Sequence, residues 1–355
     1  MPKVQADYSF EGGVPETPFK LHESMHGKLD PTYVEFFNTT VAYEPNIIYT
    51  HRVPLDKLRK GGNVIPGQSP KLEMAEIYDI KIPRKYTSAP TSIPARVFVP
   101  KGDVPAEGFP LLLWFHGGGW VLGGLDTENS YCTKVADICK CIVVTVDYRL
   151  APEHPFPACV DDAFESVMWA FQSGPSELNI DNLKICLGGS SAGGNLTAVV
   201  THKYASSPLS VLLPKIKFQL MIVPVTDNSA SPETHLSWRE NEYTPQLPSE
   251  KMLWYRTLYL QNGEEELTNP ESSPIFYSDE SFAKVPPCFI AAAECDVLRS
   301  EAEEYAEKLK KNGISTTIRI YPKVPHTAMV MDEVLQQGKD LINDTTLAVK
   351  SAISN

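Results

Sequence analysis

A serine stands at the centre of a Gly-x-Ser-x-Gly pattern, GSSAG at 189–193, which is typical of a nucleophile in acyl transfer. An apolar run precedes the pattern and a helical pattern follows it. A strand–turn–helix of this kind is so tight that Ser191 must adopt a strained backbone, and the flanking glycines remove side chains that would clash. The pattern predicts that the Ser191 hydroxyl is held out at the edge of a sheet. An anion-binding loop at a helix N-terminus is the alternative interpretation.

Two later residues could activate this serine, because a nucleophilic hydroxyl needs a base and the base needs an acid that orients it. Asp296 directly follows an apolar run, and His326 follows a run rich in β-branched residues. The carboxyl ends of parallel strands meet at one edge of a sheet, so we expect both side chains near Ser191. Glu294 is an alternative acid, but it stands within the predicted strand, which favours Asp296.

Three consecutive glycines follow His116 in the sequence HGGGW, at the end of the apolar run PLLLWF. Attack on a carbonyl carbon produces an oxyanion, which needs preset N–H donors. A backbone can approach the oxyanion closely only where no Cβ intervenes. We therefore expect the loop 117–119 to donate, together with the N–H of Ala192 after the nucleophile. Trp120, beside this loop, is interpreted either as lining a substrate pocket or as packing in the core.

Eight short runs rich in β-branched residues alternate with helical patterns from about residue 75 onward. The later runs are almost continuously apolar, as expected of strands buried on both faces. This alternation predicts an α/β fold with a mostly parallel, eight-stranded, doubly wound sheet. The runs lie at 74–82, 95–100, 110–115, 141–148, 183–188, 218–225, 288–294 and 316–322.

The segment 301–311 shows the helical pattern clearly, because its apolar residues recur at the spacing of one helical face. Ser300 followed by Glu303 predicts a capping box at the start of this helix. Gly313 predicts its end.

Two parts of the chain lack the strand–helix alternation. Residues 1–70 show none, and residues 226–275 separate two strands by more than an ordinary connection. Long excursions from an α/β core are usually lids or binding loops. The predicted organisation is an N-terminal part of a cap at 1–70, a first core segment at 71–225, a cap insertion at 226–275 and a second core segment at 276–355.

Composition excludes several classes of function. The 355 residues carry a net charge of −12, which argues against binding to nucleic acid or to anionic membranes. No signal peptide is expected, and no run approaches the ~18 apolar residues of a membrane span. Seven scattered cysteines without a CxxC pair predict neither disulfides nor a metal site, and they indicate a reducing, cytoplasmic compartment.

Four motifs in order resemble the hormone-sensitive-lipase-like esterases. They are HGGGW at 116–120, DYRLAPEHPFPA at 147–158, GGSSAGGN at 188–195 and CDVLRSEAEEYAEKL at 295–309. The resemblance implies an α/β-hydrolase fold whose helical cap is built from the N-terminal segment and from an insertion after the sixth strand. It also implies hydrolysis of carboxylic esters through an acyl-enzyme, without cofactor or metal.

The resemblance assigns roles residue by residue. It implies a catalytic triad of Ser191, Asp296 and His326, oxyanion donors at Gly118, Gly119 and Ala192, and loop support from Gly117 and His116. Three positions depart from the common pattern: Ser190 replaces an Asp, Val297 replaces the Pro of Asp-Pro-Leu, and Thr327 follows the histidine in place of Gly. These changes leave the triad intact and concern the shape of the pocket.

The leading hypothesis is a soluble carboxylesterase that acts on small to medium, largely apolar esters. The expected partner is a small-molecule ester, and a homodimer is left open. An amidase of the arylformamidase type, using the same triad, is the alternative. A receptor on the same scaffold is a third interpretation; the gibberellin receptors resemble this family but lack the catalytic histidine, whereas this chain retains His326.

Overall fold

An eight-stranded sheet forms the centre of the molecule, which confirms the predicted fold class. The computed structural model describes residues 14–60, 65–89 and 91–354. The strands are β1 (Glu76–Ile82), β2 (Ile93–Val99), β3 (Phe109–Phe115), β4 (Ile142–Val146), β5 (Ile180–Ser190), β6 (Phe218–Ile222), β7 (Cys288–Cys295) and β8 (Thr316–Pro325). Their order is β1-β2-β4-β3-β5-β6-β7-β8. The pairs β1–β2 and β2–β4 are antiparallel and the others are parallel.

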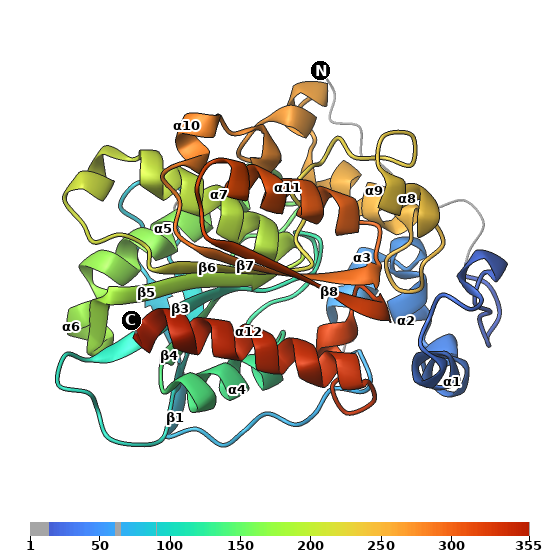
Figure 1. Cartoon of the computed structure of the whole chain (residues 1–355), viewed down its shortest axis with the longest axis horizontal. Coiled ribbons are helices and arrows are strands. Elements are labelled where there is room, and N and C mark those ends of the chain that lie inside the picture. The colour runs from blue at the N-terminus through green and yellow to red at the C-terminus, as the bar shows by residue number, and fades with distance from the viewer. Residues whose placement is uncertain (1–13, 61–64, 90, 355) are drawn as a thin grey trace.

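Helices cover both faces of this sheet. Figure 1 shows α4 and α12 on one face and α5, α7 and α11 on the other. The α-helices are α1 (Pro31–Thr39), α2 (Pro45–Ile48), α3 (Leu55–Lys60), α4 (Asn129–Cys139), α5 (Ala158–Gln172), α6 (Gly174–Leu178), α7 (Ala192–Ser206), α8 (Leu236–Glu240), α9 (Ser249–Tyr259), α10 (Asp279–Phe282), α11 (Arg299–Lys311) and α12 (Gln336–Ser354).

The strand β3 shows why the central runs are continuously apolar. Successive side chains of a strand point to opposite faces of the sheet. Leu111 and Leu113 join the apolar cluster that includes α5 and α7, and Leu112 and Trp114 join the cluster that includes α4 and α12. Both faces are therefore buried, and a polar residue at either set of positions would lose its hydration.

The helix α11 corrects the predicted capping box. It begins at Arg299, its N-cap is Leu298, and that cap makes no side-chain hydrogen bond. The Ser300 hydroxyl instead accepts a hydrogen bond from the N–H of Ser237 at 2.9 Å, and the Ser237 hydroxyl accepts one from the N–H of Ser300 at 2.9 Å. A tertiary contact to α8 thus uses the hydroxyl that the local pattern assigned to the cap.

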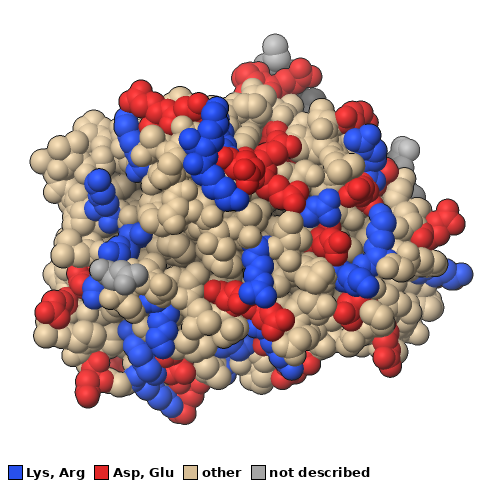
Figure 2. Space-filling model, viewed as in Figure 1, with Lys and Arg blue, Asp and Glu red and all other residues tan. Residues whose placement is uncertain are grey.

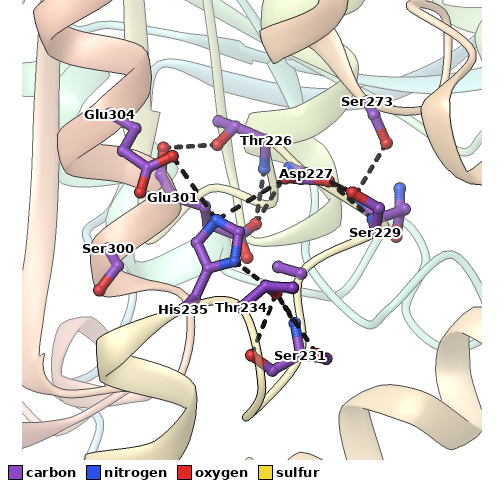
Figure 3. A network of polar contacts seen from close by, with 12 residues as sticks. Thr226, Asp227, Ser229, Ser231, Thr234, His235, Ser273, Ser300, Glu301 and Glu304 are labelled. Atoms are coloured by element: carbon purple, nitrogen blue, oxygen red, sulfur yellow. Dashed lines mark hydrogen bonds and ion pairs between the residues drawn. The ribbon is translucent and has the colours of Figure 1, made fainter.

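The insertion 226–275 begins in a buried polar network around Glu301 of α11 (Figure 3). The Glu301 carboxylate accepts hydrogen bonds from the N–H of Thr226 at 2.8 Å and from the indole N–H of Trp238 at 3.0 Å. Burial raises the pKa of Glu301 to about 8. In the same network, Nε2 of His235 lies 3.7 Å from a carboxylate oxygen of Asp227 and 3.5 Å from one of Glu304. These contacts fix the insertion to the core.

The N-terminal segment and the insertion contact each other at one end of the sheet (Figure 1). Lys251 of α9 donates a hydrogen bond to the carbonyl of Ile47 at 2.7 Å. Arg52 forms an ion pair with Glu250 at 3.2 Å. The division into cap and core stays a prediction, and residues 1–13 and 61–64 of the predicted cap lie outside the described residues.

The surface carries both signs of charge. Figure 2 shows acidic and basic side chains interspersed on the face in view, without a continuous basic patch there. Within the described ranges, no helix is long and apolar enough to cross a membrane.

Two leucines on neighbouring strands test the packing of the sheet. Leu113 of β3 is fully buried, whereas Leu183 of β5 is 64% exposed. We expect Leu113→Ala to lower the free energy of unfolding by about 2–5 kcal/mol, because it removes buried methyl groups and leaves a cavity. Leu183→Ala should change it by less than about 0.5 kcal/mol. Urea unfolding measures both, and equal losses would contradict the assigned burial.

Candidate active site

The turn between β5 and α7 holds Ser191 in a strained conformation, with φ 53° and ψ −117°. Its N–H donates to the carbonyl of Ile222 at 2.8 Å. The flanking glycines are required because a Cβ on Gly189 would overlap the carbonyl of Gly193, and a Cβ on Gly193 would overlap the carbonyl of Phe115. Strain of this kind persists only where surrounding structure enforces it.

The structure brings Ser191, His326 and Asp296 together. The Ser191 hydroxyl donates to Nε2 of His326 at 3.0 Å, and Nδ1 of His326 donates to Oδ2 of Asp296 at 2.6 Å. Asp296 is only 1% exposed, and its Oδ1 accepts from the N–H of Leu298 at 3.1 Å. A carboxylate at Nδ1 fixes the tautomer that leaves Nε2 free to accept a proton. This arrangement can deprotonate the serine hydroxyl.

Glu294, the alternative acid, lies elsewhere. Its carboxylate accepts a hydrogen bond from the N–H of Lys323 at 2.7 Å. The carbonyl groups on either side of the acid are instead bound from the insertion: Asn241 donates to the carbonyl of Asp296 at 3.0 Å, and Thr244 donates to that of Cys295 at 2.5 Å. Sequence reasoning missed these two residues, because a single Asn or Thr in a long insertion gives no local signal.

The glycine loop after β3 adopts backbone angles that favour glycine, with φ of 121° at Gly118 and 61° at Gly119. A Cβ on Gly118 would overlap the carbonyl of Leu122, and a Cβ on Gly119 would overlap the ring of Tyr255. In the part of the chain that the structure describes, no group accepts a hydrogen bond from the N–H of Gly118, Gly119 or Ala192. These three N–H groups are available to a ligand.

His116 lies beneath this loop and holds its start. The ring stacks on Tyr148 with centroids 4.2 Å apart, and the Tyr148 hydroxyl donates to the His116 carbonyl at 2.7 Å. Burial lowers the pKa of His116 to about 4, so the ring is neutral near pH 7. Its Nδ1 lies 2.7 Å from the carbonyl of Gly117 and donates to it.

Glu128 ties the loop to the turn that carries Ser191, and sequence reasoning missed it. The buried carboxylate accepts from the indole N–H of Trp114 at 2.7 Å, from the N–H of Gly117 at 3.3 Å and from the Ser190 hydroxyl. Burial raises the pKa of Glu128. The residue stands in an unremarkable polar stretch between loop and helix, so only the tertiary structure indicates its place.

A cavity of about 540 Å³ opens onto the site. Ser191, His326 and the loop 117–119 line one end, and residues of the N-terminal segment and of the insertion line the other. The volume suits a small ligand, since such pockets are typically about 300–1,000 Å³. Tyr255 and Met252 of α9 supply part of an apolar wall.

Within the described residues, no group of His, Cys, Asp or Glu could hold a metal ion.

Trp120 is placed in the core rather than in the cavity wall. It is fully buried and stacks on Tyr259 with centroids 4.1 Å apart and planes 8° from parallel. The cavity lining does not include it. The backbone at Trp120 has φ of 60°, and this turns the chain after the glycines so that the indole points inward. Of the two interpretations, core packing fits the structure.

Known proteins of similar sequence are α/β-hydrolases and esterases. A family model described as alpha/beta hydrolase fold matches residues 112–330, more than half of the chain. An AB hydrolase superfamily protein of Schizosaccharomyces pombe is 51% identical over 339 residues, covering 96% of this chain and 98% of the relative. The carboxylesterase NlhH of Mycobacterium tuberculosis is 35% identical over 263 residues, 74% of this chain and 79% of the relative.

A solved esterase structure from Pyrobaculum calidifontis superposes with a TM-score of 0.70 at 33% identity, covering 79% of this chain and 86% of that chain. The matched region of the family model includes the loop 117–119, Ser191 and Asp296 and extends past His326. The chain therefore belongs to the α/β-hydrolase family, in the hormone-sensitive-lipase-like group of carboxylic ester hydrolases that its four motifs resemble.

Proposed function

We propose that this protein is a serine hydrolase that cleaves carboxylic esters through an acyl-enzyme, with Ser191, His326 and Asp296 as its catalytic triad. The observation that carries the proposal is the hydrogen-bonded chain from Ser191 through His326 to the buried Asp296. Ser191 and His326 line a cavity large enough for a small ester. The names of relatives, carboxylesterases and esterases among them, support the same reaction class.

In the acylation step, the Ser191 oxygen attacks the ester carbonyl carbon while Nε2 of His326 takes the hydroxyl proton. The carbonyl oxygen becomes an oxyanion, and the N–H groups of Gly118, Gly119 and Ala192 are its proposed donors. These groups have no acceptor among the described residues, so binding the oxyanion displaces no internal hydrogen bond. The imidazolium then gives its proton to the leaving alcohol, and the acyl group stays on Ser191.

In the deacylation step, water attacks the acyl carbon while His326 takes one of its protons. The second tetrahedral intermediate collapses, Ser191 regains its proton from His326, and the carboxylic acid leaves. Asp296 remains ionised throughout and stabilises the imidazolium. The hydrogen bonds from Asn241 and Thr244 to the carbonyls of Asp296 and Cys295 support the position of this carboxylate beside His326.

We also propose that the N-terminal segment and the insertion together form a cap over the cavity, and that the protein resides in the cytoplasm. Lining residues from both segments support the cap. The location is supported by seven cysteines that are all buried and free. A homodimer stays a prediction.

The triad assignment is tested with 4-nitrophenyl esters of graded acyl length. We expect Ser191→Ala and His326→Ala each to lower kcat/KM by about 10⁴-fold or more, because each removes a group that acts as part of one unit. Ser176→Ala and His154→Ala change exposed residues and should keep wild-type rates. Full activity in either triad variant would refute the assignment, and faster cleavage of the matching 4-nitroanilide would favour the amidase alternative.

The oxyanion loop is tested by a matched pair of glycines with left-handed backbone, Gly119 with φ of 61° and Gly313 with φ of 79°. Both alanine variants should lose about 1–2 kcal/mol of stability, because L-residues are disfavoured there, and Gly119→Ala should lose about 1–3 kcal/mol more, because its Cβ overlaps the buried Tyr255 ring. Only Gly119→Ala should lower kcat/KM, by about 100-fold, because its Cβ meets Tyr255 and displaces the donors. Equal activity in the two variants would contradict the role of this loop.

Glu128 is expected to act as a positioning residue for the proposed reaction. Glu128→Ala leaves the donors of Trp114 and Gly117 unpaired, and we expect a loss of about 1–3 kcal/mol in stability. It should lower kcat with little change in KM, because the loop and the nucleophile lose their common anchor. Ser190→Ala removes one of the three hydrogen bonds and should lower kcat less. A Glu128→Ala variant with wild-type kcat would overturn this role.

A further inference from the structure

Lys251 is a buried cation in the wall of the proposed substrate cavity. It is only 6% exposed, and it lines the same cavity as Ser191 and His326. Its ammonium group donates to one acceptor, the carbonyl of Ile47 at 2.7 Å. An ammonium has three donors, so this contact leaves capacity unused. Among the residues that the structure describes, no carboxylate forms an ion pair with it.

A second donor stands nearby in the sequence and lines the same cavity. Gln246 is 3% exposed, and its amide nitrogen has no hydrogen-bond partner within the described ranges. The amide oxygen accepts a hydrogen bond from the hydroxyl of Thr327, the residue after His326. The backbone of Gln246 is held at φ of 72°, which costs free energy for a residue with a side chain. A strained position with an unpaired buried donor is typical of a ligand site.

The other charged residues of the cavity wall have partners. Arg59 donates to the carbonyls of Val121 and Ala151 and pairs with Glu153. Asp126 pairs with Arg96, and Glu128 accepts the three hydrogen bonds described above. Arg59 pairs with Glu153 and His326 pairs with Asp296, so Lys251 is the one basic residue of the described wall that lacks a carboxylate partner.

We propose that the cavity selects esters that carry a carboxylate group remote from the scissile bond, and that Lys251 and Gln246 bind this carboxylate. The inference rests on the proposed ester hydrolysis at Ser191 and extends it to the class of substrate. Burying an ammonium without a counter-charge is costly, and a substrate carboxylate would supply the missing charge. Lys251 also stands in the first turn of α9, where the helix dipole favours an anion.

The substrate class predicted from sequence, largely apolar esters, is refined by this inference rather than replaced. Apolar side chains such as Ile47, Leu58 and Met252 share the wall with the two donors. A chain of methylene groups or a ring between ester and carboxylate fits such a lining.

The charge of Lys251 gives the selection a pH dependence. Burial lowers the pKa of Lys251 to about 7, so the ammonium of the free enzyme loses its charge as the pH rises through that value. Its neighbours at the cap are His51, Arg52 and Glu250, and the cavity contributes Arg59, Asp126, Glu128 and His326. Burial lowers the pKa of His51 to about 4, so this ring stays neutral above pH 6. Preference for a carboxylate should therefore fall with rising pH.

The test compares pairs of esters in which an isopropyl group replaces a carboxylate of the same shape. For an acyl-side carboxylate, the pair is mono-4-nitrophenyl adipate and 4-nitrophenyl 6-methylheptanoate. For an alcohol-side carboxylate, the pair is 4-acetoxybenzoate and 4-isopropylphenyl acetate. The measured quantity is the ratio of kcat/KM for the anionic ester to that for the neutral ester. We expect the wild-type ratio to exceed one in at least one pair.

In that pair, Lys251→Met should lower the ratio by roughly 10- to 100-fold, the range typical of hydrogen bonds to a charged group. Gln246→Leu should lower it by a smaller factor, because it removes one neutral donor. Lys284→Met removes the same charge from a half-exposed position near α10 and should keep the wild-type ratio. Because the ratio compares two substrates of one preparation, a loss of folded enzyme cancels.

Several outcomes would overturn the inference. They are a wild-type ratio of one or less in both pairs, a ratio that Lys251→Met leaves unchanged, or a wild-type ratio that is the same at about pH 6 and about pH 9. These results leave ester hydrolysis intact, because the neutral esters still report it. If the wild-type protein cleaves none of the four esters, the proposed function itself fails.

Discussion

The close approach of two backbones at the end of the central strands is the constraint on which the site depends. At Gly193, the first turn of α7 lies so near the carbonyl of Phe115 that any side chain would overlap it. Phe115 ends β3 and pairs with Gly189 of β5. The loop after β3 and the turn before α7 are therefore forced together. This contact brings the loop 117–119 and Ser191 to one cavity, and it explains why glycine stands at 189 and 193.

The position of Asp296, the proposed acid, depends on a second constraint, which the insertion supplies. Asp296 directly follows β7, and Asn241 and Thr244 of the insertion donate hydrogen bonds to the carbonyls of Asp296 and Cys295. The insertion is in turn fixed by Glu301, which accepts hydrogen bonds from Thr226 and Trp238. The insertion thus both lines the cavity and holds the backbone of Asp296. The two roles are coupled because the same segment carries both sets of contacts.

The buried charged groups of the cavity wall differ in how fully the protein itself supplies their partners. Near Ser191, the carboxylates of Glu128 and Asp296 accept hydrogen bonds from internal donors. At the cap side, Lys251 has only a carbonyl partner. The first arrangement preorganises a reaction, because its groups need not move when charge develops. The second is suited to recognition, because its charge is matched only when a ligand arrives.

The sequence by itself determined the eight strands, because buried strands leave strong local patterns. It also determined the candidates Ser191, Asp296 and His326, because each follows a predicted strand and Ser191 stands in a recognisable tight turn. It also predicted the glycine loop, since only glycine permits that approach. Tertiary structure alone decided the rest. No local pattern distinguishes four residues of the site: Glu128, Asn241, Gln246 and Lys251. The hydroxyl of Ser300, predicted to cap its own helix, accepts a hydrogen bond from Ser237 instead. Trp120, for which the sequence left open a place in the pocket wall or in the core, packs in the core. These outcomes depend on which distant groups share a buried space, and no local pattern records that.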